Sequence, residues 1–230
     1  MPATIATQML KRRDSGFLVT LGAVSVALTI EVVSDVICPW CYIGKRRLEK
    51  AIAALQGEVS AEIHWLPFQL NPTMPREGMP RAEYRARKFG SLERSRELDA
   101  RVAKEGEGEG IAFAFDSIER TPNTVAAHAL VGLAQQQRRA GAVVDALFRG
   151  YFEEAKDIGD AAVLAGVAER CQVSGWPRQE AMTEVVALDN QMRELGISAV
   201  PTFILGRKFA VSGAHPSATL AEAIKEASAK

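Results

Sequence analysis

The chain has 230 residues and a formal net charge of zero, because 28 Lys and Arg residues balance 28 Asp and Glu residues. With 47% hydrophobic and 24% charged residues, the composition is typical of a soluble globular protein with one large domain, or one domain that carries an insertion. The balanced charge excludes a general basic field for nucleic acid or anionic lipid, and no apolar run reaches the roughly 18 residues that span a bilayer. We therefore expect neither a nucleic-acid nor a membrane partner. The sequence does not determine the oligomeric state.

The first 27 residues admit two interpretations. The basic residues 11–13 precede the apolar run "GFLVTLGAV", and Ser25-Val26-Ala27 resembles a small-x-small cleavage site, which together form a weak secretory signal. The alternative is an N-terminal extension, because the apolar run continues into "LTIEVVSD", which suits a core strand. The extension predicts a cytoplasmic protein, whereas a signal peptide would make it periplasmic.

Residues 28–74 predict a βαβ unit. "LTIEVVSDVI" (28–37) is short and rich in β-branched residues, as expected for a buried strand. From Pro39 to Gly57 the apolar residues recur at helical spacing, and Pro39 suits the first helical turn, where its missing N–H costs nothing. "AEIHWLPFQL" (61–70) predicts a second strand. Such a crossover joins parallel strands and is almost always right-handed.

Residues 75–180 carry little strand signal and predict an all-helical block. "IAFAF" (111–115) is the stretch that best suits a short extended segment. Thr121-Pro122 predicts an N-cap followed by Pro at the first helical position. Further helices are expected near 141–155, 160–171 and 177–195.

The β signal returns after Gly196. "PTFIL" and "KFAVSG" predict two short strands around a turn at Gly206-Arg207, and an amphipathic helix ends the chain. The element order is therefore βαβ, helical block, ββα. We expect an α/β fold in which 28–74 and 181–230 share one sheet and the helical block of 75–180 is an insertion.

Cys38 and Cys41 stand three positions apart between the first strand and the first helix, and three kinds of site use such a pair. Zinc needs about four ligands, but the third cysteine and the three histidines are scattered along the chain. A disulfide across two residues closes too small a loop to stabilise a fold by much. The third kind of site is a redox pair, and it has support of its own.

A cysteine that opens a helix receives the positive end of the helix dipole, which stabilises its thiolate and lowers its pKa. Cys38 occupies that position and is expected to be an exposed nucleophile. Cys41, one turn further into the helix, is placed to attack the mixed disulfide that Cys38 forms. A CxxC pair that opens the helix of a βαβ unit is a thioredoxin-like redox motif. The redox interpretation is therefore favoured.

Several runs resemble a known family. "CPWC" after a strand, the distant "AVPTFIL", the terminal ββα and the helical insertion resemble the DsbA-like branch of the thioredoxin superfamily. The fuller runs "SDVICPWCYIGKRRLEKA", "PNTVAAHAL" and "SAVPTFILGRKFAVSGAHP" look most like its FrnE-type members. The resemblance covers about residues 28 to 228. It implies a thioredoxin fold with a large helical insertion.

The resemblance also implies roles for residues near the cysteines. Val200-Pro201 matches a loop whose proline is cis and packs beside the cysteine pair, which would leave the backbone of Val200 free to pair with an extended substrate. Pro39 and Trp40 would tune thiolate stability and contact substrates. The alternatives are strand punctuation for Pro201 and core packing for Trp40. No cofactor or metal is implied beyond the redox-active disulfide, although glutathione is a candidate co-substrate.

Further residues carry less specific signals. "PNTVAAH" makes Asn123 and His128 candidate neighbours of the active site, but a core or capping histidine is the alternative. Asp35 could assist proton transfer or bind the strand end through hydrogen bonds. Cys171 follows apolar residues at helical spacing and is assigned to the core. The basic run 45–47 is expected to be a solvated helix face.

The leading hypothesis is a thiol–disulfide oxidoreductase that acts on protein or small-molecule thiols and disulfides. The alternative is a glutathione-dependent isomerase or transferase of the 2-hydroxychromene-2-carboxylate isomerase type, which shares the DsbA-like architecture. In that group a serine typically stands where Cys38 does, and the CxxC pair is missing, so this chain departs from the pattern at the decisive position. A third hypothesis is a binding module without enzymatic activity. It gives no role to the cysteine at the start of the helix.

Overall fold

The computed structural model describes residues 25–229. Most of the N-terminal segment, and with it the choice between signal peptide and extension and the location that depends on it, lies outside the described residues. Val26 and Ala27 are described, and they pair with Val59 and Ser60 as the start of the first strand. Within 25–229, no helix combines the length and the apolar character needed to cross a membrane.

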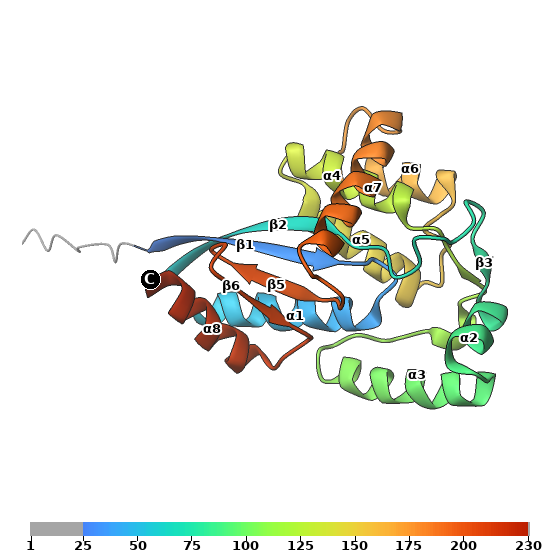
Figure 1. The fold of residues 1–230 in the computed structure, drawn as a ribbon, viewed down its shortest axis with the longest axis horizontal. Coiled ribbons are helices and arrows are strands. Elements are labelled where there is room, and N and C mark those ends of the chain that lie inside the picture. Colours follow the sequence, from blue (N-terminus) through green and yellow to red (C-terminus); the bar gives the residue numbers. More distant parts are fainter. Residues whose placement is uncertain (1–24, 230) are drawn as a thin grey trace, which may run out of the picture.

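One four-stranded sheet contains strands from both ends of the chain, which confirms the prediction that they share a sheet (Figure 1). Its order is β2-β1-β5-β6, with β1 parallel to β2 and antiparallel to β5, and with β6 antiparallel to β5. Ile30, Val32 and Val33 of β1 are fully buried, because helices cover both faces of this central strand. The bounds are β1 Val26–Ser34, β2 Val59–Pro67, β5 Thr202–Leu205 and β6 Phe209–Ser212.

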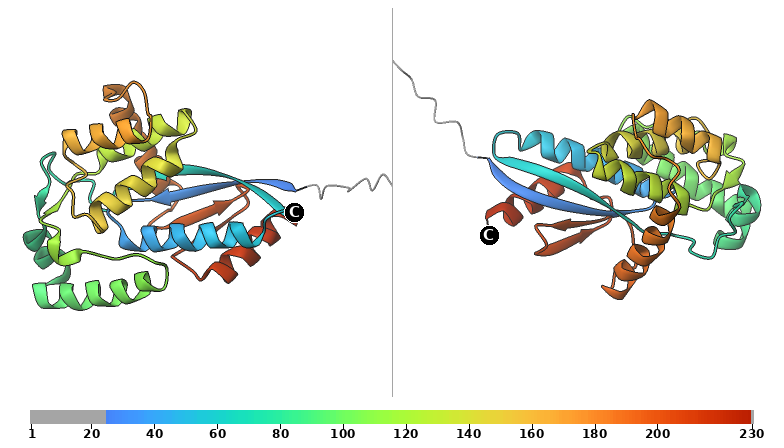
Figure 2. Two further views of the ribbon diagram at one scale, coloured as in Figure 1. Left: turned by 180° about the vertical axis from the view of Figure 1, so that it is seen from behind. Right: turned by 90° about the horizontal axis from the view of Figure 1, so that it is seen from above.

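Helices pack on both faces of the sheet. On one face α1 (Pro39–Ala54) and α8 (Ser217–Ala229) lie side by side, while α4 (Val125–Gln136) and α7 (Gln179–Glu194) contact β2 from the other (Figures 1 and 2). β1 points toward the end of the sheet where the inserted helices lie, and α1 starts there and runs back. The loop that carries the two cysteines is thus placed against the helical block.

The helical block also contains α2, α3, α5 and α6, but it is not all helical. Residues 79–80 and 120–121 form two short antiparallel strands. Their pairing joins the beginning and the end of the segment that contains α2 and α3. "IAFAF" is no strand; its last residue begins a short 3-10 helix. The bounds are α2 Arg81–Phe89, α3 Leu92–Glu107, α5 Ala140–Phe152, α6 Ala161–Arg170, β3 Met79–Pro80, β4 Arg120–Thr121 and the 3-10 helix Phe115–Ser117.

The predicted N-cap at Thr121 is wrong. Thr121 pairs with Met79 in β4, so its backbone is extended, and α4 starts four residues later at Val125. The side-chain oxygen of Asn123 accepts a hydrogen bond from the backbone N–H of Val125 at 3.0 Å. A local asparagine turn therefore supplies the partner that the first turn of α4 needs.

The basic run at 45–47 is not a solvated helix face. The side chain of Lys45 is only 3% exposed, and it forms ion pairs with Glu49 and with Asp145 of α5, the latter at 2.6 Å. Arg47 binds Glu109 at 2.7 Å, and it also donates to the backbone carbonyl of Ala214. The prediction fails because the insertion and the loop before α8 pack over α1, which the helix pattern alone does not reveal.

Cys171 is half-buried and follows the last residue of α6, so the assignment to a closed core is only partly right. It packs against the edge of the main hydrophobic cluster. Burial raises the pKa of its thiol above the usual range.

Candidate active site

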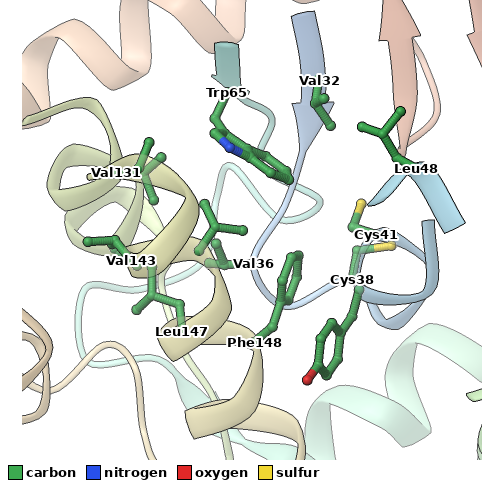
Figure 3. Close-up of a cluster of buried hydrophobic side chains, with 14 of the residues drawn as sticks. Val32, Val36, Cys38, Cys41, Leu48, Trp65, Val131, Val143, Leu147 and Phe148 are labelled. Carbon is green, nitrogen blue, oxygen red and sulfur yellow. The ribbon is translucent and has the colours of Figure 1, made fainter. Parts of the chain in front are cut away.

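Cys38 is the N-cap residue of α1, and Pro39 is the first helical residue, as the sequence predicted. The backbone N–H of Cys38 donates to the carbonyl of Asp35 at 3.0 Å, and the N–H of Cys41 donates to the carbonyl of Cys38 at 3.0 Å. Both thiols are free, and their sulfur atoms lie together at the start of the helix (Figure 3). The pair is therefore in its dithiol form.

The two thiols differ in their surroundings. Cys38 lines a cavity of about 590 Å³, whereas Cys41 does not reach it. Burial raises the pKa of the Cys41 thiol well above its usual range, and the hydrogen bond to Cys38 and the charge on Cys38 act in the same direction. Cys41 consequently stays protonated at neutral pH and lies behind Cys38 as seen from the cavity.

Cys38 is not the exposed residue that the sequence suggested. It is 5% exposed, and Cys41 is 2% exposed. The difference arises from the insertion, since residues of α2, α3 and the end of α5 form the far wall of the cavity. A reactant must enter this cavity to meet the Cys38 sulfur.

The loop before β5 also lines the cavity, through residues 198–200. The peptide bond between Val200 and Pro201 is cis. The thiol of Cys38 approaches the carbonyl oxygen of Val200 at 3.8 Å, within the range of a weak sulfur hydrogen bond. Val200 also lines the cavity, so its backbone lies beside the Cys38 sulfur at the cavity wall.

Gly44 is a contact residue that sequence reasoning missed. A Cβ atom built on it would lie 2.8 Å from Cγ of Pro201, a distance that real Cβ contacts do not reach. Only glycine lets α1 pack this closely on the loop. The sequence did hold a signal, because glycine inside a helix costs about 1 kcal/mol relative to alanine and its presence there calls for a packing reason.

Asp35 is completely buried and binds the loop that carries the cysteines. One carboxylate oxygen accepts from the backbone N–H of Leu70 at 2.7 Å, and the other accepts from the N–H of Ile37 at 3.3 Å. Of the two roles considered for Asp35, the contacts correspond to the binding of the strand end.

His128 and Asn123 do not line the cavity that Cys38 faces. Nε2 of the buried His128 lies 3.4 Å from an oxygen of Asp35, and the ring lines a separate cavity beside Trp65. Asn123 donates to the backbone carbonyl of Met74 at 2.8 Å in addition to its bond at the start of α4. The structure thus brings His128 behind the cysteine loop and leaves Asn123 in a structural contact.

Trp40 is 39% exposed and lines the cavity next to Cys38, so it is not a core residue. Aromatic side chains make up much of the remaining wall, and four cationic side chains with one carboxylate also face the space. The aromatic members are Tyr84, Phe89, Phe115, Tyr151 and Phe152, and the charged members are Arg81, Arg85, Lys88, Arg101 and Asp99. Across residues 25–229, no three cysteine, histidine or acidic side chains gather as metal ligands.

Comparisons with known proteins agree with this geometry. A family model described as a DSBA-like thioredoxin domain matches residues 29–225. The uncharacterized protein YwbO of Bacillus subtilis (strain 168) is 27% identical over 184 residues, which cover 77% of this chain and 86% of that protein. The crystal structure of a probable DsbA oxidoreductase from Streptomyces coelicolor is 28% identical, has a TM-score of 0.79, and is matched over 88% of this chain and 91% of its own.

A more distant structure shares the fold. A 2-hydroxychromene-2-carboxylate isomerase is 16% identical with a TM-score of 0.59, and the match covers 86% of this chain and 95% of that one. At this identity the likeness concerns the fold alone, so it does not distinguish between redox and isomerase chemistry.

Proposed function

The chain belongs to the family of DSBA-like thioredoxin domains, and from that premise we propose that it exchanges disulfides through the pair Cys38 and Cys41. The observation that carries the proposal is the placement of two free thiols at the start of α1, one facing a cavity and one buried behind it. The likeness of the runs around CPWC and Pro201 to FrnE-type members forms part of the same proposal.

The reaction needs only the two cysteines and a reactant disulfide. The Cys38 thiolate attacks one sulfur of the reactant, whose S–S bond breaks and releases the first thiolate. Cys41 then loses its proton and attacks the sulfur of Cys38, which forms the Cys38–Cys41 disulfide and releases the second thiolate. Two electrons pass from the protein to the reactant, and the two released thiolates take up two protons. The reverse sequence oxidises a dithiol.

Three neighbours would guide this reaction. The N–H groups of the first turn of α1 point toward the N-cap and favour a negative charge on Cys38. The backbone of Val200, next to the Cys38 sulfur, would pair with the reactant on its other side. Pro39 and Trp40 would contact the reactant, since both line the cavity. No bound cofactor is required, and glutathione would serve as a diffusible co-substrate.

The alternative is a glutathione-dependent isomerase. It has the same fold, but it would use the position of Cys38 alone and leave the buried thiol of Cys41 without a part in the reaction. The raised pKa of Cys41 and its contact with Cys38 suit a resolving thiol. We therefore favour the oxidoreductase.

Single-turnover exchange distinguishes the two. The reduced protein is mixed with 2-hydroxyethyl disulfide, quenched with acid, and its free thiols are counted by alkylation and mass spectrometry. We expect the wild type and Cys171→Ser to lose two thiols per chain, and Cys38→Ser to lose none. A Cys38→Ser protein that still closes a disulfide at the wild-type rate would refute the proposal.

A further inference from the structure

The cavity that Cys38 faces holds more positive than negative charge. Arg81, Arg85, Lys88 and Arg101 line it, and Asp99 is the single carboxylate among its lining residues. The side chains of Arg81 and Arg85 are only 11% and 12% exposed. Their charges therefore act inside the cavity, where solvent and salt screen them far less than on a surface.

Two guanidinium groups share that one carboxylate. An Nη atom of Arg81 lies 3.1 Å from one oxygen of Asp99, and Arg85 binds the other oxygen. One negative charge thus neutralises only one of the two positive charges. Burial lowers the pKa of Arg85, and the positive charge of Arg81 acts in the same direction. Burial raises the pKa of Asp99, and nearby Asp116 acts in the same direction, but Asp116 does not line the cavity, so the lining itself carries more positive than negative charge.

Arg85 is held in place rather than free to turn away. Its Nε donates to the side-chain oxygen of Ser95 at 2.6 Å, and its guanidinium lies 4.3 Å from the centre of the Phe89 ring. Arg81 stands over the ring of Phe115 at 5.5 Å. The Nη2 of Arg85 also donates to the backbone carbonyl of Ser95 at 3.2 Å and binds Asp99. Nη1 is therefore the nitrogen of this fixed cationic group that can donate to a further carboxylate.

The size of the cavity also restricts the reactant. About 590 Å³ falls in the range of small-molecule pockets. Resting on the proposed function, we propose that this protein prefers small disulfides whose organic groups carry a carboxylate, with the carboxylate bound by Arg85 and Arg81 and the disulfide sulfur presented to Cys38. The aromatic wall then packs on the carbon chain between the two ends.

Three disulfides of similar length test this preference: 3,3'-dithiodipropionate with two carboxylates, 2-hydroxyethyl disulfide without charge, and cystamine with two ammonium groups. The negative charge of a thiolate attracts the ammonium groups of cystamine and repels the carboxylates of dithiodipropionate. If the arginines had no effect, Cys38 would therefore react fastest with cystamine. For the reduced wild type at low salt we expect the reverse order of single-turnover rate constants. The rate constant for dithiodipropionate should be about 10-fold larger than that for 2-hydroxyethyl disulfide, which corresponds to about 1.4 kcal/mol of charge pairing.

Substitutions then assign the preference to the two arginines. Arg85→Gln should lower the ratio of the dithiodipropionate to the 2-hydroxyethyl disulfide rate constant about 10-fold. Asp99→Asn should raise it, because both guanidiniums then lack a negatively charged partner in the cavity. The matched control is Arg94→Gln, on α3 with a half-exposed side chain that pairs with Glu97, which should leave the ratio unchanged. High salt should reduce the wild-type ratio by less than Arg85→Gln does, because buried charges are only partly screened, and this measurement does not depend on how any variant folds.

The outcomes separate this inference from the function on which it rests. A wild-type ratio of one or less, or a ratio that neither Arg85→Gln nor salt alters, would overturn the carboxylate preference while disulfide exchange stands. Failure of the wild type to react with any of the three disulfides would instead refute the exchange function itself.

Discussion

The sulfur of Cys38 lies 3.8 Å from the carbonyl oxygen of Val200, a residue 162 positions further along the chain. The first belongs to the start of α1, and the second to the loop before β5. Because β1 and β5 are neighbours in the sheet, both segments reach the same end of it. The proposed nucleophile and the backbone that would hold its reactant are therefore placed together by the pairing of two strands.

Substitution of Gly44 tests the close packing of α1 on this loop. The methyl group of Gly44→Ala would meet Pro201 at 2.8 Å and Phe203 at 3.2 Å, so the loop must move. We expect a loss of about 1–2 kcal/mol in the free energy of unfolding, in the range of overpacked cores, and slower single-turnover exchange because Val200 moves with Pro201. Urea unfolding and the exchange rate constant provide the measurements.

Gly132 of α4 is the matched control, because no atom outside its chain neighbours and the backbone of its own helix lies within 4 Å of a Cβ built on it. Gly132→Ala should stabilise the protein by about 0.5–1 kcal/mol through helix propensity alone. If Gly44→Ala gains stability as Gly132→Ala does, the close contact with Pro201 does not exist.

Asp35→Asn distinguishes a structural from a proton-transfer role for this buried carboxylate. Asparagine offers one acceptor oxygen where two backbone N–H groups, of Leu70 and Ile37, need partners. The expected loss is about 1–3 kcal/mol of unfolding free energy, the cost of an unpaired buried donor. Glu62→Gln, whose side chain is 76% exposed, serves as the control and should change stability little.

The pH dependence of exchange completes this test. If Asp35 only positions the cysteine loop, the profile of Asp35→Asn keeps the shape of the wild-type profile at a changed overall rate. Loss of one limb of the profile would instead assign proton transfer to Asp35.

The thiol of Cys41 should make the reduced protein less stable in alkali. Its pKa is higher in the folded protein than the ordinary value of 9.0, because burial disfavours the thiolate. The folded state thus holds the proton more tightly, so this stabilisation is complete below about pH 9 and is lost as the pH rises further, by at most about 1.4 kcal/mol per pH unit. Unfolding free energies from pH 8 to 10, with a phosphine reductant present, measure the effect.

Two variants assign this effect to its residue. Cys41→Ala should make the decline between pH 9 and 10 smaller, whereas Cys171→Ser should retain it, because the half-buried Cys171 is less removed from water. The buried hydroxyls of Tyr42 and Tyr151, whose pKa is raised to about 12, add to the decline mainly above pH 10. An equal decline in Cys41→Ala and in the wild type would show that another group titrates.

The start of α1 was predictable because its signals are local. Cys38 at the N-cap and Pro39 in the first turn follow from the residues themselves, and the strands that flank the insertion follow from their β-branched composition. The prediction for Thr121 failed because Thr121 pairs with Met79, which is distant in the sequence, and this strand pairing overrides the local capping pattern.

The wall of the cavity could not be predicted in this way. Arg81 and Arg85 stand in a charged, helix-favouring stretch that is typical of a solvated helix, and only the packing of α2 against α3 and the ring of Phe115 buries them. The inserted helices and the loop before β5 enclose Cys38, and the packing over α1 buries Lys45. When a side chain is buried by an element that is distant in the sequence, the hydrophobic periodicity of its own helix does not reveal that burial.

The most direct test of the account is to identify which sulfur forms the mixed disulfide. Cys41→Ser removes the resolving thiol, so the adduct of the protein with 2-hydroxyethyl disulfide should accumulate and be visible by intact mass. Digestion and mass spectrometry should place the adduct on Cys38, with Cys171 unmodified at the earliest times. An adduct found first on Cys171, or no adduct on Cys38, would contradict the assignment of Cys38 as the nucleophile of this protein.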